Sequence, residues 1–388
     1  MTVRVELRRD AGRVGPESGP WIRRRQIARI HGSPDPHAIA EVVDRHGDTI
    51  GFGLISAVSQ ISVRLLTFGP APLPDDWLQR RLQRAFDART TYAFAEDGTT
   101  GYREVNSEGD GLPGLVVDRY GDDLVAQITT APMAAREDAI MQWLQTRRPG
   151  RVHILLPESA AAREGFEAAV RRDHEDALLH FTEHNLDIAV PAPPSQKTGG
   201  YLDQRANRRF VARLARKHGG ALLDIGCHVG GFALHAARAG VEAVGVDQSR
   251  HVLEVAAANA ERNNVRGVRW VEADMFGSLQ VGALQGPFGT IVLDPPRLAR
   301  SKSEVPRALA AVERLVGRIA PRLAERGHLV LCSCSHHMDG DDLDRLMAST
   351  SRPFTRIAAL GAGIDHPIAP GHREGEYLRV HVYQLRTD

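Results

Sequence analysis

The feature that most constrains the fold is a regular alternation of short apolar strands and helices over the C-terminal half of the chain. Such an alternation predicts a parallel sheet with helices on its faces, because parallel strands need crossover connections. Ligands of these sheets bind where the strands end. Several of the apolar segments end in a carboxylate, which is hard to explain by packing alone. A binding site is therefore predicted at one edge of the sheet, beside Asp224, Asp247, Asp274 and Asp294.

A glycine-rich turn follows the first of these strands. The stretch Asp224-Ile-Gly226-Cys-His-Val-Gly230-Gly231 ends an apolar segment and precedes an alanine-rich helix. Glycines let the backbone turn sharply and approach a ligand, and a helix N-terminus offers free N–H groups. The spacing differs from the Gly-x-Gly-x-x-Gly pattern that holds a pyrophosphate, whereas the carboxylate of Asp247 suits the two hydroxyls of a ribose. A ligand with a ribose and no phosphates is S-adenosylmethionine. An ordinary turn with another ligand is the alternative.

Two further strand ends carry candidate chemistry. Asp294-Pro-Pro296 fixes the backbone after the fourth strand, so that the carboxylate points into the cleft and can hydrogen-bond a planar base. Leu331-Cys-Ser-Cys-Ser335 ends the fifth strand, where side-chain alternation places Cys332 and Cys334 on one face. Cysteines on buried strands are usually small core residues, but Cys334 lies at the strand end beside two histidines, where a nearby positive charge can favour a thiolate.

The length of 388 residues predicts two or three domains. Many short strands before the proline-spaced stretch 70–74 indicate a small barrel over residues 1–74, and a second proline cluster at 191–194 separates a central α/β domain, 75–192, from a Rossmann-like domain, 193–388. Strands are expected at 3–8, 27–30, 40–43, 49–54, 62–66, 152–156, near His180 and at 186–190, helices at 77–88, 135–147 and 159–172, and a closing antiparallel pair at 354–360 and 377–385.

Composition and charge narrow the class of protein. The formal net charge of +1 excludes a globally basic nucleic-acid binder, although residues 1–30 hold eight arginines against three acidic residues. Such a cluster favours polyanions, and a solvated arginine face is the alternative. No apolar run is long enough for a membrane span, and the charged N-terminus is unlike a targeting peptide. Three cysteines make no disulfide framework, so we expect a cytoplasmic protein. The acidic set Glu108, Asp110, Asp118 and Asp122 is typical of turns, and no metal site is predicted.

Several motifs together resemble one known family. They are the block Gln196-Lys-Thr-Gly-Gly-Tyr-Leu-Asp-Gln-Arg205 with Asn207-Arg208, the Gly230-Gly-Phe232 turn, Asp294-Pro-Pro296, Ser301-Lys302, Cys332-Ser-Cys-Ser335, and, in the middle of the chain, Glu108-Gly-Asp-Gly-Leu-Pro-Gly114 with Val117-Asp-Arg-Tyr-Gly121. In this order and over almost the whole chain they resemble the bacterial 23S ribosomal RNA cytosine-C5 methyltransferases with an N-terminal PUA domain. The resemblance implies a PUA barrel that binds RNA, followed by a central domain and a class I methyltransferase domain.

The resemblance also assigns roles to residues. It implies that Cys334 is the catalytic nucleophile. Our own hypothesis is that Asp294 holds the target base. Large-subunit ribosomal RNA would be the partner, and a homodimer is left open. The chain departs from the family pattern at Gly200, at Arg297-Leu298 after Asp-Pro-Pro, and at Arg23-Arg-Arg25 after Trp21. The residues implied to contact S-adenosylmethionine are Lys197, Thr198, Tyr201, Asp203, Gln204, Arg205, Asp224, Gly226, Gly230, Gly231, Asp247, Asp274 and Asp294.

Two alternative functions remain at this point. The first is a methyltransferase for an exocyclic amine, guanine N2 or adenine N6, in RNA. An aromatic residue after Asp-Pro-Pro would favour it, and this chain has Arg297 there. The second is a non-catalytic RNA-binding factor for ribosome assembly.

Overall fold

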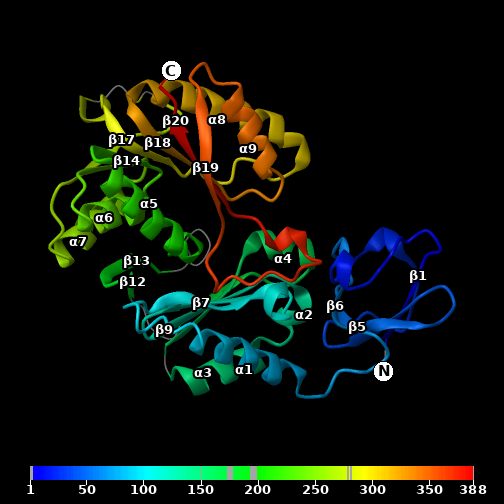
Figure 1. Ribbon diagram of the computed structural model, residues 1–388. Helices are drawn as coiled ribbons and strands as arrows, with labels where there is room; N and C mark the ends of the chain where they lie inside the picture. The colour runs from blue at the N-terminus through cyan, green and yellow to red at the C-terminus, as the bar shows by residue number, and fades with distance from the viewer. Residues whose placement is uncertain are drawn as a thin grey trace. The chain divides into compact units, whose positions relative to one another are not determined.

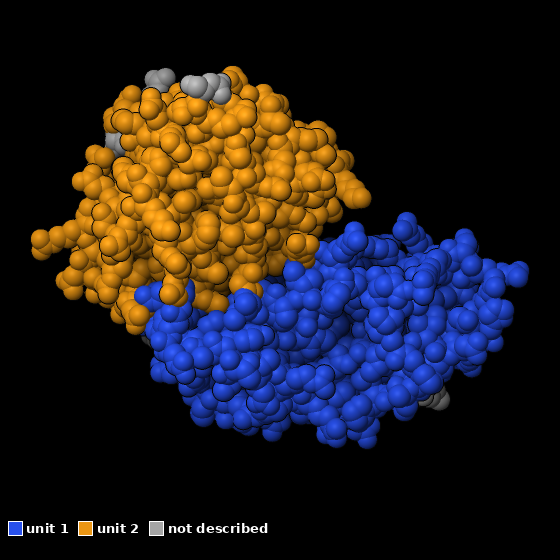
Figure 2. All heavy atoms as spheres, viewed as in Figure 1, with its two compact units in different colours: residues 1–184, 191–200, 364–375 blue, residues 185–190, 201–363, 376–388 orange. Residues whose placement is uncertain are grey.

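The computed structural model describes residues 3–149, 151–172, 178–192, 199–277, 279 and 282–387. The chain forms two compact units, coloured separately in Figure 2. Unit 1 comprises residues 1–184, 191–200 and 364–375, and unit 2 comprises residues 185–190, 201–363 and 376–388. None of the helices in the described part of the chain has the length and hydropathy that a membrane span needs.

The N-terminal part of unit 1, drawn in blue in Figure 1, contains a six-stranded sheet. Its strand order is β2-β6-β5-β4-β1-β3. Alternating residues of its strands meet in an apolar core that includes Val5, Val42 and Val63. The prediction of many short strands is confirmed, although the strand β2, which has only three residues, was missed. The strands are β1 (Val3–Leu7), β2 (Trp21–Arg23), β3 (Ile27–His31), β4 (Ile39–Val43), β5 (Thr49–Ile55) and β6 (Ile61–Phe68).

The second part of unit 1 is a five-stranded sheet in the order β11-β10-β9-β8-β7. Helix α4 ends where Gly165 adopts a φ of +77°, and residues 169–171 then pair with β10 as a strand. The helix predicted over 159–172 is therefore wrong in its second half. The elements are α1 (Trp77–Thr90), β7 (Gly101–Asn106), β8 (Leu115–Tyr120), β9 (Asp123–Ile128), α2 (Ala131–Ala134), α3 (Glu137–Arg147), β10 (Val152–Leu156), α4 (Glu158–Glu164), β11 (Ala169–Arg171) and β12 (Leu178–Glu183).

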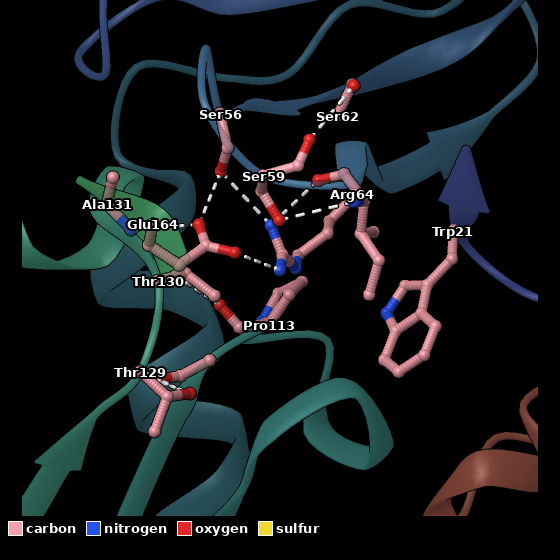
Figure 3. Close-up of polar contacts among 12 residues, drawn as sticks. Trp21, Ser56, Ser59, Ser62, Arg64, Pro113, Thr129, Thr130, Ala131 and Glu164 are labelled. Atoms are coloured by element: carbon pink, nitrogen blue, oxygen red, sulfur yellow. Dashed lines mark hydrogen bonds and ion pairs between the residues drawn. The ribbon is translucent and has the colours of Figure 1, made fainter. Parts of the chain in front are cut away.

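A buried ion pair joins the two sheets of unit 1. Arg64 of β6 donates to Glu164 of α4 over 2.7 Å, and the two side chains are 6% and 5% exposed. Ser56 donates to the same carboxylate at 2.8 Å and accepts from the guanidinium of Arg64 at 3.1 Å. Figure 3 shows the three side chains pointing toward one another. Because a buried charge is costly unless it is paired, the pair links the N-terminal sheet to the central helix α4.

Unit 2 is built on a seven-stranded sheet in the order β16-β15-β14-β17-β18-β20-β19, with five parallel strands followed by an antiparallel pair. Both the parallel sheet and the closing antiparallel pair were predicted. The elements are β13 (Leu186–Pro191, of which only 186–190 belong to this unit), α5 (Arg205–His218), β14 (Ala221–Ile225), α6 (Gly231–Arg238), β15 (Ala243–Asp247), α7 (Arg250–Arg262), β16 (Val268–Glu272), β17 (Phe288–Leu293), α8 (Val305–Ile319), β18 (Leu323–Ser333), α9 (Gly340–Ala348), β19 (Phe354–Leu360) and β20 (Arg379–Leu385).

Helices cover both faces of this sheet. Successive residues of β14 point to opposite sides, so Leu222 packs with α5 and α6 whereas Leu223 packs with α8 and α9. The apolar stripe of α8, which includes Val312, Leu315 and Ile319, is fully buried against the sheet. The strand ends are thereby held at fixed positions, as the alternation in the sequence predicts.

The segment 364–375 was not predicted to leave the sheet of unit 2. The chain leaves unit 2 after β19, runs through unit 1 and returns before β20. Within unit 1, Asp365 is fully buried, its carboxylate accepts from the backbone N–H of Arg103 at 2.9 Å, and its carbonyl accepts from Arg89 at 2.8 Å. Such partners are distant in sequence. The boundaries of the three predicted domains stay a prediction.

Candidate active site

The glycine turn after β14 is shaped by close neighbours. Gly226 has a φ of +83°, and a Cβ there would overlap the carbonyl oxygen of Asp294. Gly230 has a φ of +89° and lies against the ring of Trp270. A side chain at either position would strain the backbone and collide, so the sequence keeps glycine there. Helix α6 begins directly after the turn, and its first residue is Gly231.

Asp224 lies inside the turn. Its side chain is fully buried, and one carboxylate oxygen accepts from the backbone N–H of Ala233, near the N-terminus of α6, at 3.0 Å. The other oxygen has no hydrogen-bond partner among the described residues. Burial, reinforced by the charges of Asp294 and Asp247, raises the pKa of Asp224 to about 7, although Ala233 and Arg208 oppose the shift. A buried carboxylate with a spare acceptor suits a cationic or hydrogen-bonding ligand.

Asp247 ends β15 and is held on both sides. Its two carboxylate oxygens accept from the backbone N–H groups of His228 and Ser249, each at 3.0 Å. These bonds fix the direction of the carboxylate, and each oxygen keeps a lone pair for a further donor. The position and geometry fit the predicted contact with a ribose diol.

Asp274 lies apart from the other three aspartates. It follows the edge strand β16, its side chain is exposed, and its carboxylate accepts from the backbone N–H of Phe276 at 2.9 Å. The structure thus groups Asp224, Asp247 and Asp294 electrostatically and leaves Asp274 at the outer end of the sheet.

The Tyr-Leu-Asp-Gln-Arg block forms a turn before α5. Tyr201 has a φ of +47°, and its ring meets the ring of His228 at 5.1 Å between centroids. The buried amide of Gln204 donates to the carboxylate of Asp294 at 3.2 Å. Asp203 and Arg205 are also buried, and Asp203 accepts from the hydroxyl of Tyr377 at 2.7 Å. The predicted contacts of Lys197 and Thr198 lie outside the described residues.

The Asp-Pro-Pro turn and the cysteines meet at one small cavity. Asp294 directly follows β17, and its backbone N–H donates to the carbonyl of Ile225 at 3.0 Å. The cavity is lined by Pro295, Pro296, Cys332 and Cys334, among others. Cys334 is the first residue after β18 and is partly exposed, whereas Cys332 is buried within the strand. Burial raises the pKa of the Cys332 thiol well above its ordinary value, which keeps that thiol protonated.

Sequence reasoning missed two contributors to the site. Arg208 is buried and donates to the backbone carbonyl of Tyr201 at 3.0 Å, and it lies against Gly231. Its place in the Asn207-Arg208 pair of the family block was the available sign. Tyr377, the partner of Asp203, follows the excursion through unit 1 and carries no local motif.

The acidic residues near the middle of the chain have structural partners in unit 1. Asp110 pairs with Arg89 at 2.7 Å, and Asp118 pairs with Arg103 at 2.8 Å. Glu108 accepts from the indole N–H of Trp21 at 2.8 Å. These bonds give the three carboxylates a structural role in unit 1. Across the described part of the chain, no group of three or more His, Cys, Asp and Glu side chains is placed to hold a metal ion.

Comparison with known proteins gives matches over both parts of the chain. The family described as methyltransferase small domain matches residues 198–353, and the family described as PUA-like domain matches residues 7–68. Two solved structures each have a TM-score of 0.80 at 17% identity. One is a protein assigned as a methyltransferase, in complex with SAH, and the other is a Streptococcus mutans protein assigned as a SAM-dependent methyltransferase. They cover 99% and 98% of this chain and 100% and 99% of their own. The predicted fold, a PUA-like domain with a class I methyltransferase domain, is thereby confirmed.

Curated relatives share the full length. The ribosomal RNA large subunit methyltransferase I of Shewanella frigidimarina is 34% identical over 394 residues, which cover 98% of each chain. The protein of the same name from Photobacterium profundum is 32% identical over 375 residues, covering 93% of this chain and 94% of its own. The predicted cofactor, S-adenosylmethionine, is confirmed as the methyl donor of this class of enzyme. At this level of identity over almost its whole length, the chain belongs to the ribosomal RNA large subunit methyltransferase I family.

Proposed function

We propose that the chain transfers a methyl group from S-adenosylmethionine to carbon 5 of a cytosine in large-subunit ribosomal RNA, with Cys334 as the nucleophile. Family membership supports the transfer to this RNA, and the cavity shared by the Asp-Pro-Pro turn and Cys334 supports the cytosine chemistry. We also propose a cytoplasmic location. A homodimer stays a prediction.

The glycine turn fits the cofactor. Gly226 and Gly230 let the turn pack closely against Asp294 and Trp270, and Asp247 is oriented by two backbone donors for the ribose hydroxyls. The spare oxygen of buried Asp224 can accept a hydrogen bond from the cationic amino-acid part of the molecule. S-adenosylmethionine supplies a methyl group on a sulfonium, which is ready for attack by a carbon nucleophile.

The cysteine is needed because carbon 5 of cytosine is a weak nucleophile. A thiolate of Cys334 would form a bond from Sγ to carbon 6, and the electron pair of the 5,6 double bond would then take up the methyl group at carbon 5. Loss of the carbon-5 proton to a base and departure of the thiolate restore the double bond. Asp294, held by Gln204, would accept from the exocyclic amine of the base. The target nucleotide must leave its stack to reach the cavity.

The choice of Cys334 over Cys332 rests on exposure. Cys332 is buried in the strand, and its thiol is kept protonated, whereas Cys334 is partly exposed and lines the same cavity. Only a thiolate that reaches the base can act as nucleophile.

The test is covalent trapping. RNA that carries 5-fluorocytosine should form a stable adduct with the wild-type enzyme, because fluorine cannot leave as a proton does. Cys334→Ala should abolish both the adduct and methyl transfer while S-adenosylmethionine binding, measured by calorimetry, survives. Cys332→Ala is the matched control. This variant should still form the adduct, although the protein itself should be less stable.

The alternatives give different results. An amine methyltransferase needs no thiol, so an active Cys334→Ala protein together with an N-methylated base in digested RNA would favour it. An assembly factor would bind RNA and transfer no tritiated methyl group. An adduct that maps to Cys332 would refute the assignment of the nucleophile.

A further inference from the structure

A second pocket lies in unit 1, at the arginine motif that departs from the family pattern. Its volume is about 530 Å³, within the range of ligand-binding pockets. Its walls come from the stretch around Arg8, from the stretch Ser18 to Gln26, and from His372 and Glu374 of the segment 364–375. All of these residues belong to unit 1, and none is used in the proposed methyl transfer.

Three arginines line the pocket. Arg25 is exposed and makes no ion pair within the described residues. Arg23 faces Glu374 at 3.5 Å, and Arg8 faces Asp10 at 3.8 Å, with all four side chains more than 40% exposed. Exposed pairs at such distances contribute at most about 1 kcal/mol, so an anionic ligand can compete for both arginines.

A fixed aromatic side chain stands beside these cations. The indole N–H of Trp21 donates to Glu108 at 2.8 Å, and its ring meets the buried ring of His372 edge-on at 4.5 Å. The guanidinium of Arg23 lies 5.8 Å from the centre of the same ring. A held aromatic surface combined with a basic rim is what proteins use to bind single-stranded nucleic acid.

We propose that this pocket binds one nucleotide of single-stranded ribosomal RNA, with its phosphates at Arg8, Arg23 and Arg25 and its base against Trp21. The identity of the ligand as RNA rests on the proposed function, whereas the pocket itself does not. The site would anchor the substrate at a place separate from the cavity of Cys334.

The segment 364–375 makes the pocket composite. It is anchored in unit 1, where the amide of Asn106 donates to the carbonyl of Pro367 at 2.9 Å and Arg89 donates to the carbonyl of Asp365. It continues on both sides into the sheet of unit 2, through β19 and β20. Its carboxylate at Glu374 opposes an RNA phosphate at Arg23, so removing that charge should strengthen binding.

The test measures binding of a fluorescent single-stranded oligouridylate to the full chain as a function of salt. Arg23→Gln/Arg25→Gln should weaken binding roughly tenfold and lower the salt slope by about 1.4, because each lost phosphate contact on a single strand removes about 0.7. Glu374→Gln should tighten binding severalfold. The control Arg9→Gln/Arg29→Gln removes the same charge from two exposed positions, one in the turn after β1 and one in β3, that do not line the pocket.

The outcomes distinguish binding at this pocket from nonspecific attraction to positive charge, and they do not depend on the proposed methyl transfer. Equal losses in the two double variants, or no gain from Glu374→Gln, would overturn the proposal. Competition by inorganic phosphate at the same concentration as the oligonucleotide would show an anion site only, which also overturns it. Repeating the series in Cys334→Ala protein should give the same differences, so a failure of the proposed methyl transfer leaves the result readable.

Discussion

At the scale of single residues, the unusual group is Asp224. Its pKa of about 7 in the folded protein lies above the ordinary value of 3.8, so the folded chain holds a proton that the unfolded chain releases. The stability that this group contributes is therefore complete below about pH 4 and is lost as the pH rises through about 7. At neutral pH the buried carboxylate therefore lowers the stability of the fold. Such a destabilising group is typical of a ligand-binding site.

Asp224→Asn should remove this cost. The unfolding free energy of the variant at pH 8 should exceed that of the wild type by about 1–4 kcal/mol, and the difference should vanish near pH 4. Urea unfolding of unit 2 between pH 4 and pH 8 measures it. Asp274→Asn is the control, because Asp274 also accepts from a backbone N–H but is exposed. Affinity for S-adenosylmethionine should fall in Asp224→Asn. A pH-independent difference would contradict the burial argument.

At the scale of elements, the contact between α5 and the start of α6 connects packing to the predicted cofactor site. Gly231 opens α6, and a Cβ there would lie 2.5 Å from the guanidinium of Arg208, which holds the carbonyl of Tyr201. Gly231→Ala should therefore displace Arg208 and weaken binding of S-adenosylhomocysteine roughly tenfold in a calorimetric titration. Gly317→Ala in α8 has open space and should stabilise the helix by up to about 1 kcal/mol without changing affinity. Wild-type affinity in Gly231→Ala would show that Arg208 can move freely.

The elements also show what the sequence could predict. The parallel strands and the positions of Asp247 and Asp294 followed from local apolar runs and their ends, because such runs determine a buried strand by themselves. The second half of the helix predicted at 159–172 failed, because pairing of residues 169–171 with β10 outweighed local helical periodicity. The contacts of Asp203 with Tyr377 and of Asp365 with Arg103 join residues far apart in sequence, and no local sequence pattern predicts them.

At the scale of the whole molecule, the two units are each held together by contacts between distant parts of the chain. Unit 1 includes the N-terminal sheet, the central sheet and the segment 364–375, whereas the predicted cofactor-binding residues that the structure describes lie in unit 2. Unfolding of such a chain need not be a single transition. A change buried in unit 1 should therefore affect RNA binding and the stability of unit 1 more than cofactor affinity.

The pair Arg64–Glu164 tests this separation. Arg64→Met leaves the carboxylate of Glu164, 5% exposed, without its guanidinium, and should destabilise unit 1 by about 3–5 kcal/mol. Arg64→Met/Glu164→Leu should recover most of the loss, because an apolar pair replaces the buried charges. The control Arg345→Met breaks a pair with Asp342 in which the guanidinium is 70% exposed, and it should cost less than about 1 kcal/mol. Hydrogen exchange followed by mass spectrometry should show faster exchange in the N-terminal sheet and α4 of Arg64→Met, with calorimetric affinity for S-adenosylmethionine unchanged. Faster exchange spread equally over both units, or no recovery in the double variant, would contradict the role given to this pair.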